Sequence, residues 1–428
     1  MQDPKVLEQM RADWNQRAGE DANYYVAFGR RDQDDEEFFA TADEIVSSFE
    51  MELQRLPGRD AALEIGCGPG RLMRPLAKHF KEIHGVDVSD EMIKLAKVRL
   101  TGTPNAFPQH GTGSDLAMFP DGKFDFVYSY AVFQHIPSRD VVFSYLREAW
   151  RVLKDGGVLR CQVNGLPPAA KQYDTWSGVR IAPEEIFAFA RAQDFQLLVI
   201  EQIWTQYMWI TCRKRARGWR LRPARPSGPS TIRNISNALT GEAVAPAGGA
   251  LAALSLWVHN LPVDCDLLNT KVIADGGECR VTYIGQAAKD GITQVNAALP
   301  EVIRTGMVPV EIFGDEHPLC APAWVRIAPA GPAVPRVTTI TDGVNLIYGS
   351  RIVSRCVKVT MIEVRNALTF HATVDGYDAV EIDSFCADPV TLRYEFNFKL
   401  PARIVSGKHE VVVRLGKRTF PPLPIEVV

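Results

Sequence analysis

The chain has 428 residues, a formal net charge of −3, 46% hydrophobic residues and 23% charged residues. This is the composition of a soluble globular protein, which excludes the fibrous and disordered classes, and the length predicts about three domains. The near-neutral charge gives no reason to expect a nucleic acid as the partner.

The placement of apolar residues and cysteines predicts a cytoplasmic protein. Residues 1–20 carry charges of both signs and no apolar segment of the secretory type. The most apolar stretch, Ala243–Val258, is too short to span a bilayer and contains Pro246, so we expect no membrane span. The eight cysteines form no CxxC pair and no metal-ligand pattern, so we expect reduced thiols and no metal, with a disulfide in the C-terminal half as the alternative.

Residues 1–212 alternate segments of helical period with short apolar runs. Helices are predicted at 34–56, 71–80, 90–99, 140–153 and 183–193. Strands are predicted at 61–65, 82–86, 124–129, 157–163 and 197–203, followed by an antiparallel strand at the sheet edge, 204–212. This alternation predicts a doubly wound α/β sheet.

The first predicted strand runs into a glycine-rich turn with the sequence LEIGCGPGR, at Leu63–Arg71. Its glycines let the backbone approach a ligand at positions where a Cβ would collide. A dinucleotide site expects its third glycine one position later. Because Glu64 also precedes the turn, a nucleoside with an amino-acid tail fits this site better than a pyrophosphate does.

This motif resembles the first motif of the class I S-adenosylmethionine-dependent methyltransferases, and the resemblance extends over about residues 25–212. It implies a Rossmann-like fold and S-adenosylmethionine as the cofactor. Glu64 would organise the loop and help hold the amino group, and Gly66 and Gly68 would line the methionine tail. The resemblance also assigns cofactor contacts to Cys67, Arg71 and, from the N-terminal lid helices around residues 14–18 and 23–27, Tyr25.

Two further acidic positions match the family. The second strand ends at Asp87, whose carboxylate can accept hydrogen bonds from both ribose hydroxyls, with Val88 beside it. A helix cap is the alternative role for Asp87, although Ser89 is better placed for that. Asp115 resembles the family's adenine ligand, with the amide of Leu116 next to the ring, and a plain turn is the alternative.

The fourth strand leads to the residues that the resemblance assigns to methyl transfer. Tyr130 would border the cofactor. His135 is the candidate general base, because imidazole titrates near neutrality, and packing at a helix entry is its alternative role. The residues expected to contact the acceptor, with packing as the alternative for the aromatic ones, are Gln134, Asn164, Tyr173 and Trp176.

The composition changes after residue 212. Residues 213–230 carry seven basic side chains in the first thirteen positions and then Pro, Ser and Gly, which indicates a linker, with a phosphate-binding patch as the alternative. A period near one hundred residues relates Val272–Gly276 to Ala372–Gly376, within sequence rich in Val, Thr, Pro and Gly. We therefore predict two all-β immunoglobulin-like sandwiches, at 231–331 and 332–428.

These features predict that residues 1–212 form an S-adenosylmethionine-dependent methyltransferase acting on a small-molecule or glycan acceptor. The sandwiches would bind the acceptor or assemble the chain into a homo-oligomer, a choice that fold alone does not make. One rival function is a dinucleotide-dependent oxidoreductase, which the glycine spacing disfavours. The other is a non-catalytic binding scaffold, which the set of Glu64, Asp87 and Asp115 disfavours.

Overall fold

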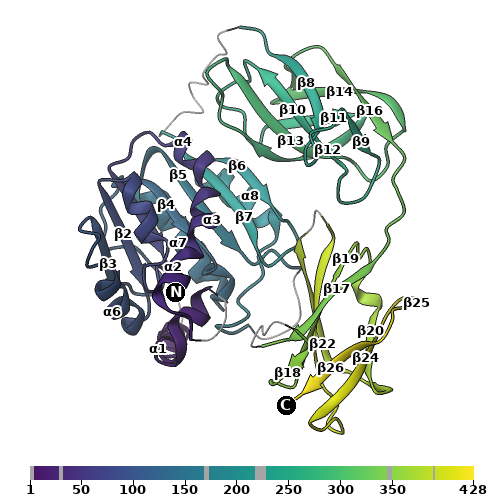
Figure 1. Ribbon diagram of the computed structural model, residues 1–428. Helices are drawn as coiled ribbons and strands as arrows, with labels where there is room; N and C mark the ends of the chain where they lie inside the picture. The colour runs from purple at the N-terminus through teal and green to yellow at the C-terminus, as the bar shows by residue number, and fades with distance from the viewer. Residues whose placement is uncertain (1–3, 28–31, 168–172, 217–227, 345–348, 389–390) are drawn as a thin grey trace.

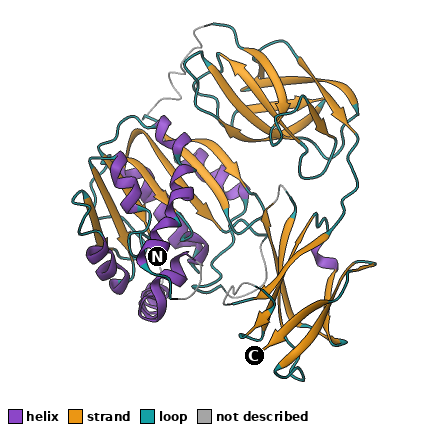
Figure 2. Cartoon of the chain, in the orientation of Figure 1, coloured by secondary structure: helices purple, strands orange, loops and turns teal. Residues whose placement is uncertain are grey.

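The computed structural model describes residues 4–27, 32–167, 173–216, 228–344, 349–388 and 391–428. Figure 1 shows an N-terminal α/β domain followed by two all-β units. Figure 2 shows that all helices of more than one turn lie in the α/β domain. We call the two all-β units the first sandwich, from β8 to β16, and the second sandwich, from β17 to β26.

The α/β domain is built on a sheet with the strand order β3-β2-β1-β4-β5-β7-β6. The first five of these strands run parallel, and β7 is antiparallel to both of its neighbours. The strands are β1 (Ala61–Ile65), β2 (Glu82–Asp87), β3 (Ala106–His110), β4 (Phe124–Ser129), β5 (Leu153–Val163), β6 (Phe195–Glu201) and β7 (Met208–Lys214). The sequence analysis missed β3, because only its central Pro108 is buried and the strand lacks a continuous apolar run.

Three helices begin and end within a residue or so of their predicted bounds: α6 (Asp90–Arg99), α7 (Arg139–Val152) and α8 (Pro183–Ala192). The side chain of Ser89 caps α6, as expected. The helix predicted at 34–56 is instead three short helices, α2 (Asp35–Ala40), α3 (Ala42–Ser47) and α4 (Glu50–Arg55). The helix predicted at 71–80 is only α5 (Met73–Leu76) and a 3₁₀ turn, η1 (Ala77–His79), since Pro75 restricts the chain before it.

The predicted position of the antiparallel strand is wrong. That strand, β7, does pair with β6, but it lies between β5 and β6 rather than at the edge. β6 is the last strand of the domain, and its buried residues Phe195–Ile200 are apolar apart from Gln196. Both strands are almost entirely buried, so hydrophobic pattern could not tell which one lies outside.

The first sandwich packs two sheets around one apolar core. One sheet has the order β8-β10-β13-β12 and the other β11-β14-β16-β9, with the short β15 beside β14. The strands are β8 (Thr231–Asn237), β9 (Val244–Pro246), β10 (Ala253–His259), β11 (Thr270–Ala274), β12 (Gly277–Ile284), β13 (Ile292–Ala298), β14 (Gly306–Gly314), β15 (His317–Pro318) and β16 (Ala323–Ala328). Alternate residues such as Leu254, Leu256 and Val258 are fully buried, as a two-layer β fold requires.

The second sandwich repeats this plan with the sheets β17-β19-β23-β22 and β18-β26-β24-β20-β21, the latter with β25 beside β24. Its strands are β17 (Arg336–Asp342), β18 (Arg351–Ile352), β19 (Cys356–Ile362), β20 (Phe370–Val374), β21 (Tyr377–Asp378), β22 (Val380–Asp388), β23 (Arg393–Lys399), β24 (Gly407–Leu415), β25 (Arg418–Thr419) and β26 (Leu423–Val427). The sequence repeat falls on one hairpin turn in each sandwich. Asp275 and Asp375 both have positive φ, and their amides donate over 3.0 Å to the carbonyls of Pro309 and Glu410.

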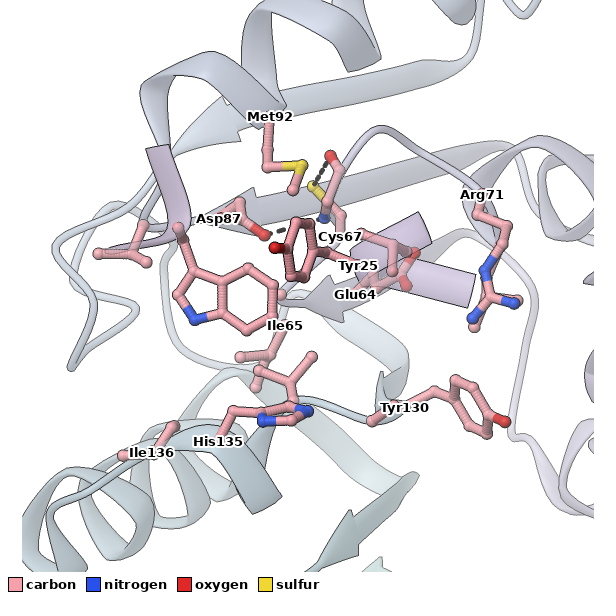
Figure 3. A pocket seen from close by; sticks show the side chains of 18 of the residues that line it. Tyr25, Glu64, Ile65, Cys67, Arg71, Asp87, Met92, Tyr130, His135 and Ile136 are labelled. Carbon is pink, nitrogen blue, oxygen red and sulfur yellow. Dashed lines mark hydrogen bonds between the residues drawn. The ribbon is translucent and has the colours of Figure 1, made fainter. Parts of the chain in front are cut away.

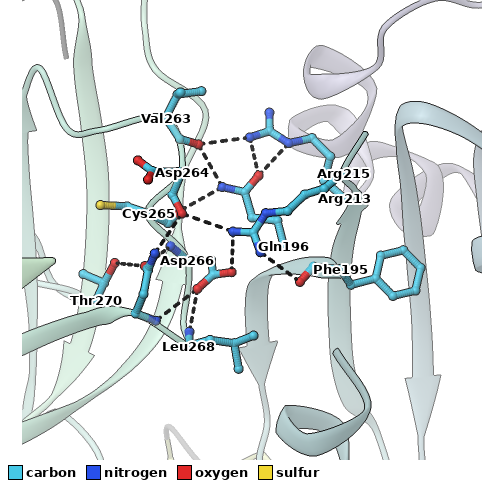
Figure 4. Close-up of polar contacts among 11 residues, drawn as sticks. Phe195, Gln196, Arg213, Arg215, Val263, Asp264, Cys265, Asp266, Leu268 and Thr270 are labelled. Atoms are coloured by element: carbon cyan, nitrogen blue, oxygen red, sulfur yellow. Dashed lines mark hydrogen bonds and ion pairs between the residues drawn. The ribbon is translucent and has the colours of Figure 1, made fainter. Parts of the chain in front are cut away.

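The first sandwich is joined to the α/β domain along β6. Tyr283 of β12 pairs with Val199 of β6, so the two sheets meet edge to edge. Arg215, directly after β7, forms a buried ion pair with Asp266 at 2.8 Å (Figure 4). The start of the predicted basic linker is therefore part of this junction, and residues 217–227 lie outside the described residues.

The second sandwich meets the α/β domain at α1 (Pro4–Ala27). The hydroxyl of Tyr24 donates to the carbonyl of Val344. Tyr24 is fully buried, and the Asp342 carboxylate accepts the amide of Val344 over 2.9 Å. This contact touches the helix that covers the cavity described below.

The described residues contain no membrane-spanning helix, no metal-ligand cluster and no disulfide. None of their helices combines the length and apolarity that a membrane span needs. They contain no group of three His, Cys, Asp or Glu side chains arranged to hold a metal ion. All eight cysteines are free thiols.

Candidate cofactor and acceptor site

A cavity lies at the carboxyl ends of β1, β2 and β4, under α1 (Figure 3). These strands are adjacent and parallel, so their exits meet at one edge of the sheet, where open α/β sheets bind ligands. The lining residues come from α1, α6, α7 and the three strand exits: Met10, Trp14, Tyr25, Val26, Glu64, Ile65, Gly66, Cys67, Gly68, Arg71, Leu72, Asp87, Val88, Met92, Tyr130, Ala131, Val132, His135, Ile136 and Tyr145.

The glycine-rich turn follows β1 and forms the floor of this cavity. Gly66 has φ +76°, and a Cβ placed on it would lie 2.4 Å from a methyl carbon of Val132. The amide of Gly68 donates to the carboxylate of Asp87 over 2.9 Å. A side chain at position 66 would therefore force apart the exits of β1 and β4, which explains the glycine there.

Glu64 is a buried carboxyl group at the end of β1. Its only described hydrogen bond comes from the hydroxyl of Tyr128, over 2.9 Å. Burial raises the pKa of Glu64 to about 8, although the hydroxyl and the charge of Arg71 act in the opposite direction. Arg71 and the Tyr128 hydroxyl do not offset the burial of Glu64, so a further cation beside the carboxyl group would favour its anion. The cavity therefore favours a ligand that carries a positive charge.

Asp87 lies at the end of β2, across the turn from Glu64. Its two carboxylate oxygens accept the amides of Gly68, over 2.9 Å, and Ser89, over 2.8 Å. Burial raises the pKa of Asp87, and these amides oppose that shift. The carboxylate thus fixes the glycine turn against the start of α6 while it faces the cavity, and each oxygen keeps a free lone pair for a hydroxyl donor.

Arg71 closes the end of the cavity next to Glu64. Its guanidinium lies over the rings of Tyr130, at 5.5 Å, and Phe38, at 5.9 Å, and donates to the Thr41 hydroxyl over 3.0 Å. Its Nε has no hydrogen-bond partner among the described residues. A buried donor of this kind is available to a ligand carboxylate.

Helix α1 covers the cavity. The Asn15 side chain accepts the hydroxyl of Ser89 over 2.7 Å and the amide of Glu91 over 3.2 Å, which fastens α1 to the start of α6. Trp14 and Tyr25 lie on the cavity wall. The two segments that the sequence analysis assigns to a lid both lie in α1, and their role as a lid stays a prediction.

His135 lies in a 3₁₀ turn, η2 (Phe133–His135), at the far side of the cavity from Arg71. Its Nδ1 is 3.0 Å from the carbonyl oxygen of Trp176, so Nδ1 carries the proton and donates. No described residue bonds its Nε2, which leaves that nitrogen as an acceptor. Burial lowers the pKa of His135 to about 4, so the ring is neutral at physiological pH.

Aromatic rings surround His135. Its ring meets Trp14 edge to face at 5.5 Å and Trp176 at 5.9 Å. The guanidinium of Arg17 lies over both tryptophans, at 4.7 Å and 5.4 Å. Tyr25 contacts Trp176 at 6.2 Å. The predicted acceptor residue Trp176 therefore lies against the cavity wall, although it does not line the cavity itself.

Two residues predicted to contact adenine do not line the cavity. The Asp115 carboxylate accepts the Thr112 hydroxyl over 2.9 Å and the Ala117 amide over 3.0 Å, as a turn residue does. Leu116 is fully buried in the core, and its amide donates to Glu148 over 3.0 Å. In this structure Asp115 is a turn residue, which is the alternative role given above, because its carboxylate accepts donors from within its own turn.

Three residues predicted at the acceptor also lie away from the wall. The side chain of Asn164 bonds the carbonyl of Gly178 and the amide of Leu166. Tyr173 packs on the hydrophobic core. Gln134 is buried, and its Oε1 has no partner among the described residues. Gln134 and Asn164 help hold the segment that carries Trp176, so their role in this structure is indirect.

The sequence analysis missed several wall residues. Met10, Met92 and Tyr145 come from helix faces whose period indicates only that they are buried, so no signal distinguished cavity from core. Ala131 has φ +56°, an uncommon conformation for a residue with a Cβ, and its amide donates to Gln162 over 3.1 Å. The sequence contains one indication that Ala131 lies at the cavity, which is its position two residues after the end of β4.

Comparison with known proteins gives this region a family. Residues 63–161 match the family model described as "Methyltransferase domain". The chain is 35% identical over 109 residues to 2-methyl-6-phytyl-1,4-hydroquinone methyltransferase of Synechocystis, which is 25% of this chain and 33% of that protein. It is 33% identical over 107 residues to trans-aconitate 2-methyltransferase of Rhizobium rhizogenes, which is 24% of this chain and 38% of that protein. The chain thus spans little more than a third of the length of these curated relatives.

Among solved structures, a SAM-dependent methyltransferase from Methanosarcina mazei aligns with 39% of this chain and 98% of its own, at 20% identity and a TM-score of 0.32. The complex of DhpI with SAH aligns with 50% of this chain and 100% of its own, at 19% identity and a TM-score of 0.37. The family match stands on residues 63–161. These residues form a methyltransferase domain, and they contain the glycine turn, Glu64, Asp87 and His135.

Proposed function

We propose that the protein is an S-adenosylmethionine-dependent methyltransferase whose cofactor lies in the cavity under α1. The observation that carries this proposal is Glu64, a buried carboxyl group with its pKa raised to about 8 inside a segment that matches a methyltransferase family. The ammonium of a methionine tail would supply the missing cation, and the buried guanidinium of Arg71, with its unpaired Nε, would bind the tail carboxylate.

The remaining wall residues fit the other parts of such a cofactor. Asp87 would accept the ribose hydroxyls, with Val88 beside it, while Cys67 and Gly68 pack against the tail. When bound, the cofactor supplies an electrophilic methyl group. The protein supplies alignment and a dry site, because α1 covers the cavity and aromatic rings line its far end.

His135 would orient the acceptor. Its neutral ring, fixed by the Trp176 carbonyl, offers Nε2 to an O–H or N–H group of the acceptor. A base with a pKa near 4 holds a proton weakly, so His135 suits an acceptor that is already nucleophilic rather than an alkyl hydroxyl. The enclosed aromatic walls support a small-molecule acceptor, or the terminal unit of a glycan, over a bulky chain.

Two features outside the cavity support the rest of the organisation we propose. The methyltransferase unit would comprise residues 1–212 with the last residues of β7, and the two sandwiches would be immunoglobulin-like, given their paired sheets and common hairpin turn. Each Asp115 oxygen accepts one bond within its turn and keeps a lone pair, so its sequence-based role as an adenine ligand would need the adenine to reach beyond the cavity wall, which Asp115 does not line.

Calorimetry with S-adenosylmethionine tests the cofactor site. We expect micromolar binding that Asp87→Ala abolishes, and no binding of NAD, which an oxidoreductase would show. Asp115→Ala separates the two roles of that residue, since a turn residue leaves the affinity unchanged and an adenine ligand does not. Absence of S-adenosylmethionine binding to the folded wild-type chain would contradict the proposal.

The pKa of Glu64 gives a second test with a defined sign. Its value near 8 in the ligand-free protein is above the ordinary one, so the group is protonated at neutral pH and must lose its proton when an ammonium binds. Binding should therefore release a proton, and affinity should rise with pH up to about 8. Calorimetry in two buffers of different ionisation enthalpy measures the release. Glu64→Gln should abolish it, and a heat independent of buffer in the wild type would contradict this assignment.

A further inference from the structure

A second hollow lies on the first sandwich between the edge strand β8 and the strands β14 and β16. It shares no residue with the methyltransferase cavity. Two large apolar side chains on its wall face solvent: Trp324 is 60% exposed and Met307 is 50% exposed. Exposed tryptophan in a concave surface is typical of a binding site rather than of ordinary protein surface.

The charged residues around this hollow have one sign. Arg233 and Arg326 both line it, both are exposed, and neither forms an ion pair with a described residue. The described lining contains no Asp or Glu. A guanidinium binds a carboxylate through two parallel hydrogen bonds, so the hollow is complementary to a ligand that carries carboxylates.

The hollow reaches the edge of the adjoining sheet. Asn234, which lines the hollow, lies opposite Trp257 of β10. Trp257 lies between the buried residues Leu256 and Val258, whereas Trp324 precedes the buried Val325, so the two tryptophans point outward from the two facing sheets of the sandwich. Trp324 and Asn234 therefore belong to the hollow, and Trp257 does not.

We propose that this hollow binds an anionic polysaccharide whose sugar rings carry carboxylates. A sugar ring stacks on Trp324 through its apolar face, and Asn234 bonds the hydroxyls. Arg233 and Arg326 bind the carboxylates. This site goes beyond the proposed methyl transfer, and it does not depend on it.

An acidic peptide is the main competitor for the same charges. It would add as a strand to the free edge of β8. Strand addition would use backbone groups of β8 and leave the exposed ring of Trp324 on β16 uncovered, whereas a sugar ring stacks on it, which favours the polysaccharide.

The test is binding of oligogalacturonate to the full-length protein by calorimetry, with a neutral malto-oligosaccharide and a short acidic peptide as comparison ligands. We expect oligogalacturonate to bind, and Trp324→Ala and Arg326→Gln each to weaken it at least about tenfold. Leu368→Ala removes an apolar side chain that is 95% exposed on the second sandwich, and it should change nothing. S-adenosylmethionine affinity should be the same in all variants, so failure here is distinguishable from failure of the methyltransferase proposal.

Several results would overturn the proposal. No binding of oligogalacturonate, or binding that neither variant weakens, removes the site. Tighter binding of the acidic peptide assigns the hollow to strand addition. A wild-type dimer that Trp324→Ala converts to a monomer, seen by sedimentation, assigns it to a second copy of this chain.

Discussion

The two sandwiches share one plan but contact the methyltransferase domain in opposite ways. The first is joined to the sheet edge through paired strands and the buried Arg215–Asp266 ion pair. Among the described residues, a hydrogen bond from Tyr24 to Val344 links the second to α1. The first contact lies away from the cavity, whereas the second reaches the helix that covers it. The same fold therefore attaches to the sheet edge in one copy and to the helix over the cavity in the other.

The largest effect is expected when the buried ion pair of the first sandwich is broken. Arg215→Met leaves the Asp266 carboxylate buried without a cation, which costs about 3–5 kcal/mol. Urea unfolding of the full chain, followed by circular dichroism, measures the loss. Arg336→Met breaks an exposed pair in the second sandwich and should cost at most about 1 kcal/mol.

The double variant Arg215→Met, Asp266→Asn tests the mechanism behind this loss. Burial raises the pKa of Asp266 even though Arg215 lies 2.8 Å away, so desolvation exceeds the attraction between the pair. Removing both charges, while the side-chain oxygen of the introduced asparagine still accepts the amides of Leu268 and Asn269, should therefore recover most of the stability. If the double variant were as unstable as the single one, attraction within the ion pair would stabilise the junction. The cost of one unpaired buried charge would then not explain the loss.

A smaller effect is expected at Gln196, the one polar residue among the buried positions of β6. Its amide donates over 2.9 Å to the carbonyls of Val263 and of Cys265, both in the first sandwich (Figure 4). Gln196→Leu leaves both carbonyls without this donor and should cost about 2 kcal/mol of unfolding free energy. Gln54→Leu, which removes an exposed bond to Glu50, is the matched control and should be neutral. Equal stability of the two variants would show that the junction is open to water.

The sequence predicted the cofactor half of the site better than the acceptor half. Glu64, Gly66, Gly68 and Asp87 occupy strand exits, where a motif and a strand end fix position together. Asp115 also follows a predicted pattern, but its turn satisfies its own donors, which only coordinates reveal. The acceptor end is assembled by tertiary contacts between α1 and distant loops, which local pattern does not encode.

In the fold, too, the sequence predicted local features but not the contacts between distant strands. Turn chemistry and period predicted two repeated β units, because the Asp-Gly turn is a local signal. The order of β6 and β7 and the edge pairing of β6 with β12 depend on which buried strand meets which partner. Both strands are almost entirely buried, so their hydrophobic pattern did not show which of them pairs with which partner.

An effect near 1 kcal/mol is expected at the second sandwich. Tyr24→Phe keeps the ring but removes the hydroxyl that donates to Val344. If this contact holds the lid closed, S-adenosylmethionine should bind about fivefold more weakly, since that is what 1 kcal/mol corresponds to. Tyr377→Phe, on an exposed strand of the same sandwich, is the control. An unchanged affinity together with lower stability would make the contact structural only.

The smallest expected effect is a difference between the sandwiches in how the stability of their common hairpin depends on pH. At the common hairpin, Asp275 pairs with Arg304, whereas Asp375 lies 2.7 Å from Nδ1 of His409. Hydrogen bonding to Asp375 raises the pKa of His409, so that pair stabilises the fold below the ordinary histidine pKa and the contribution is lost as pH rises through the raised value. Arg304 lowers the pKa of Asp275, so the stabilisation by the Asp275–Arg304 pair is lost only in acid.

Because Asp375 is partly exposed to water, its pair with His409 contributes no more than about 0.5 kcal/mol. Unfolding midpoints at about pH 6 and about pH 8, compared between wild type and His409→Gln, isolate this contribution. The wild type should lose its small advantage at the higher pH, and an advantage of equal size at both would contradict the assignment.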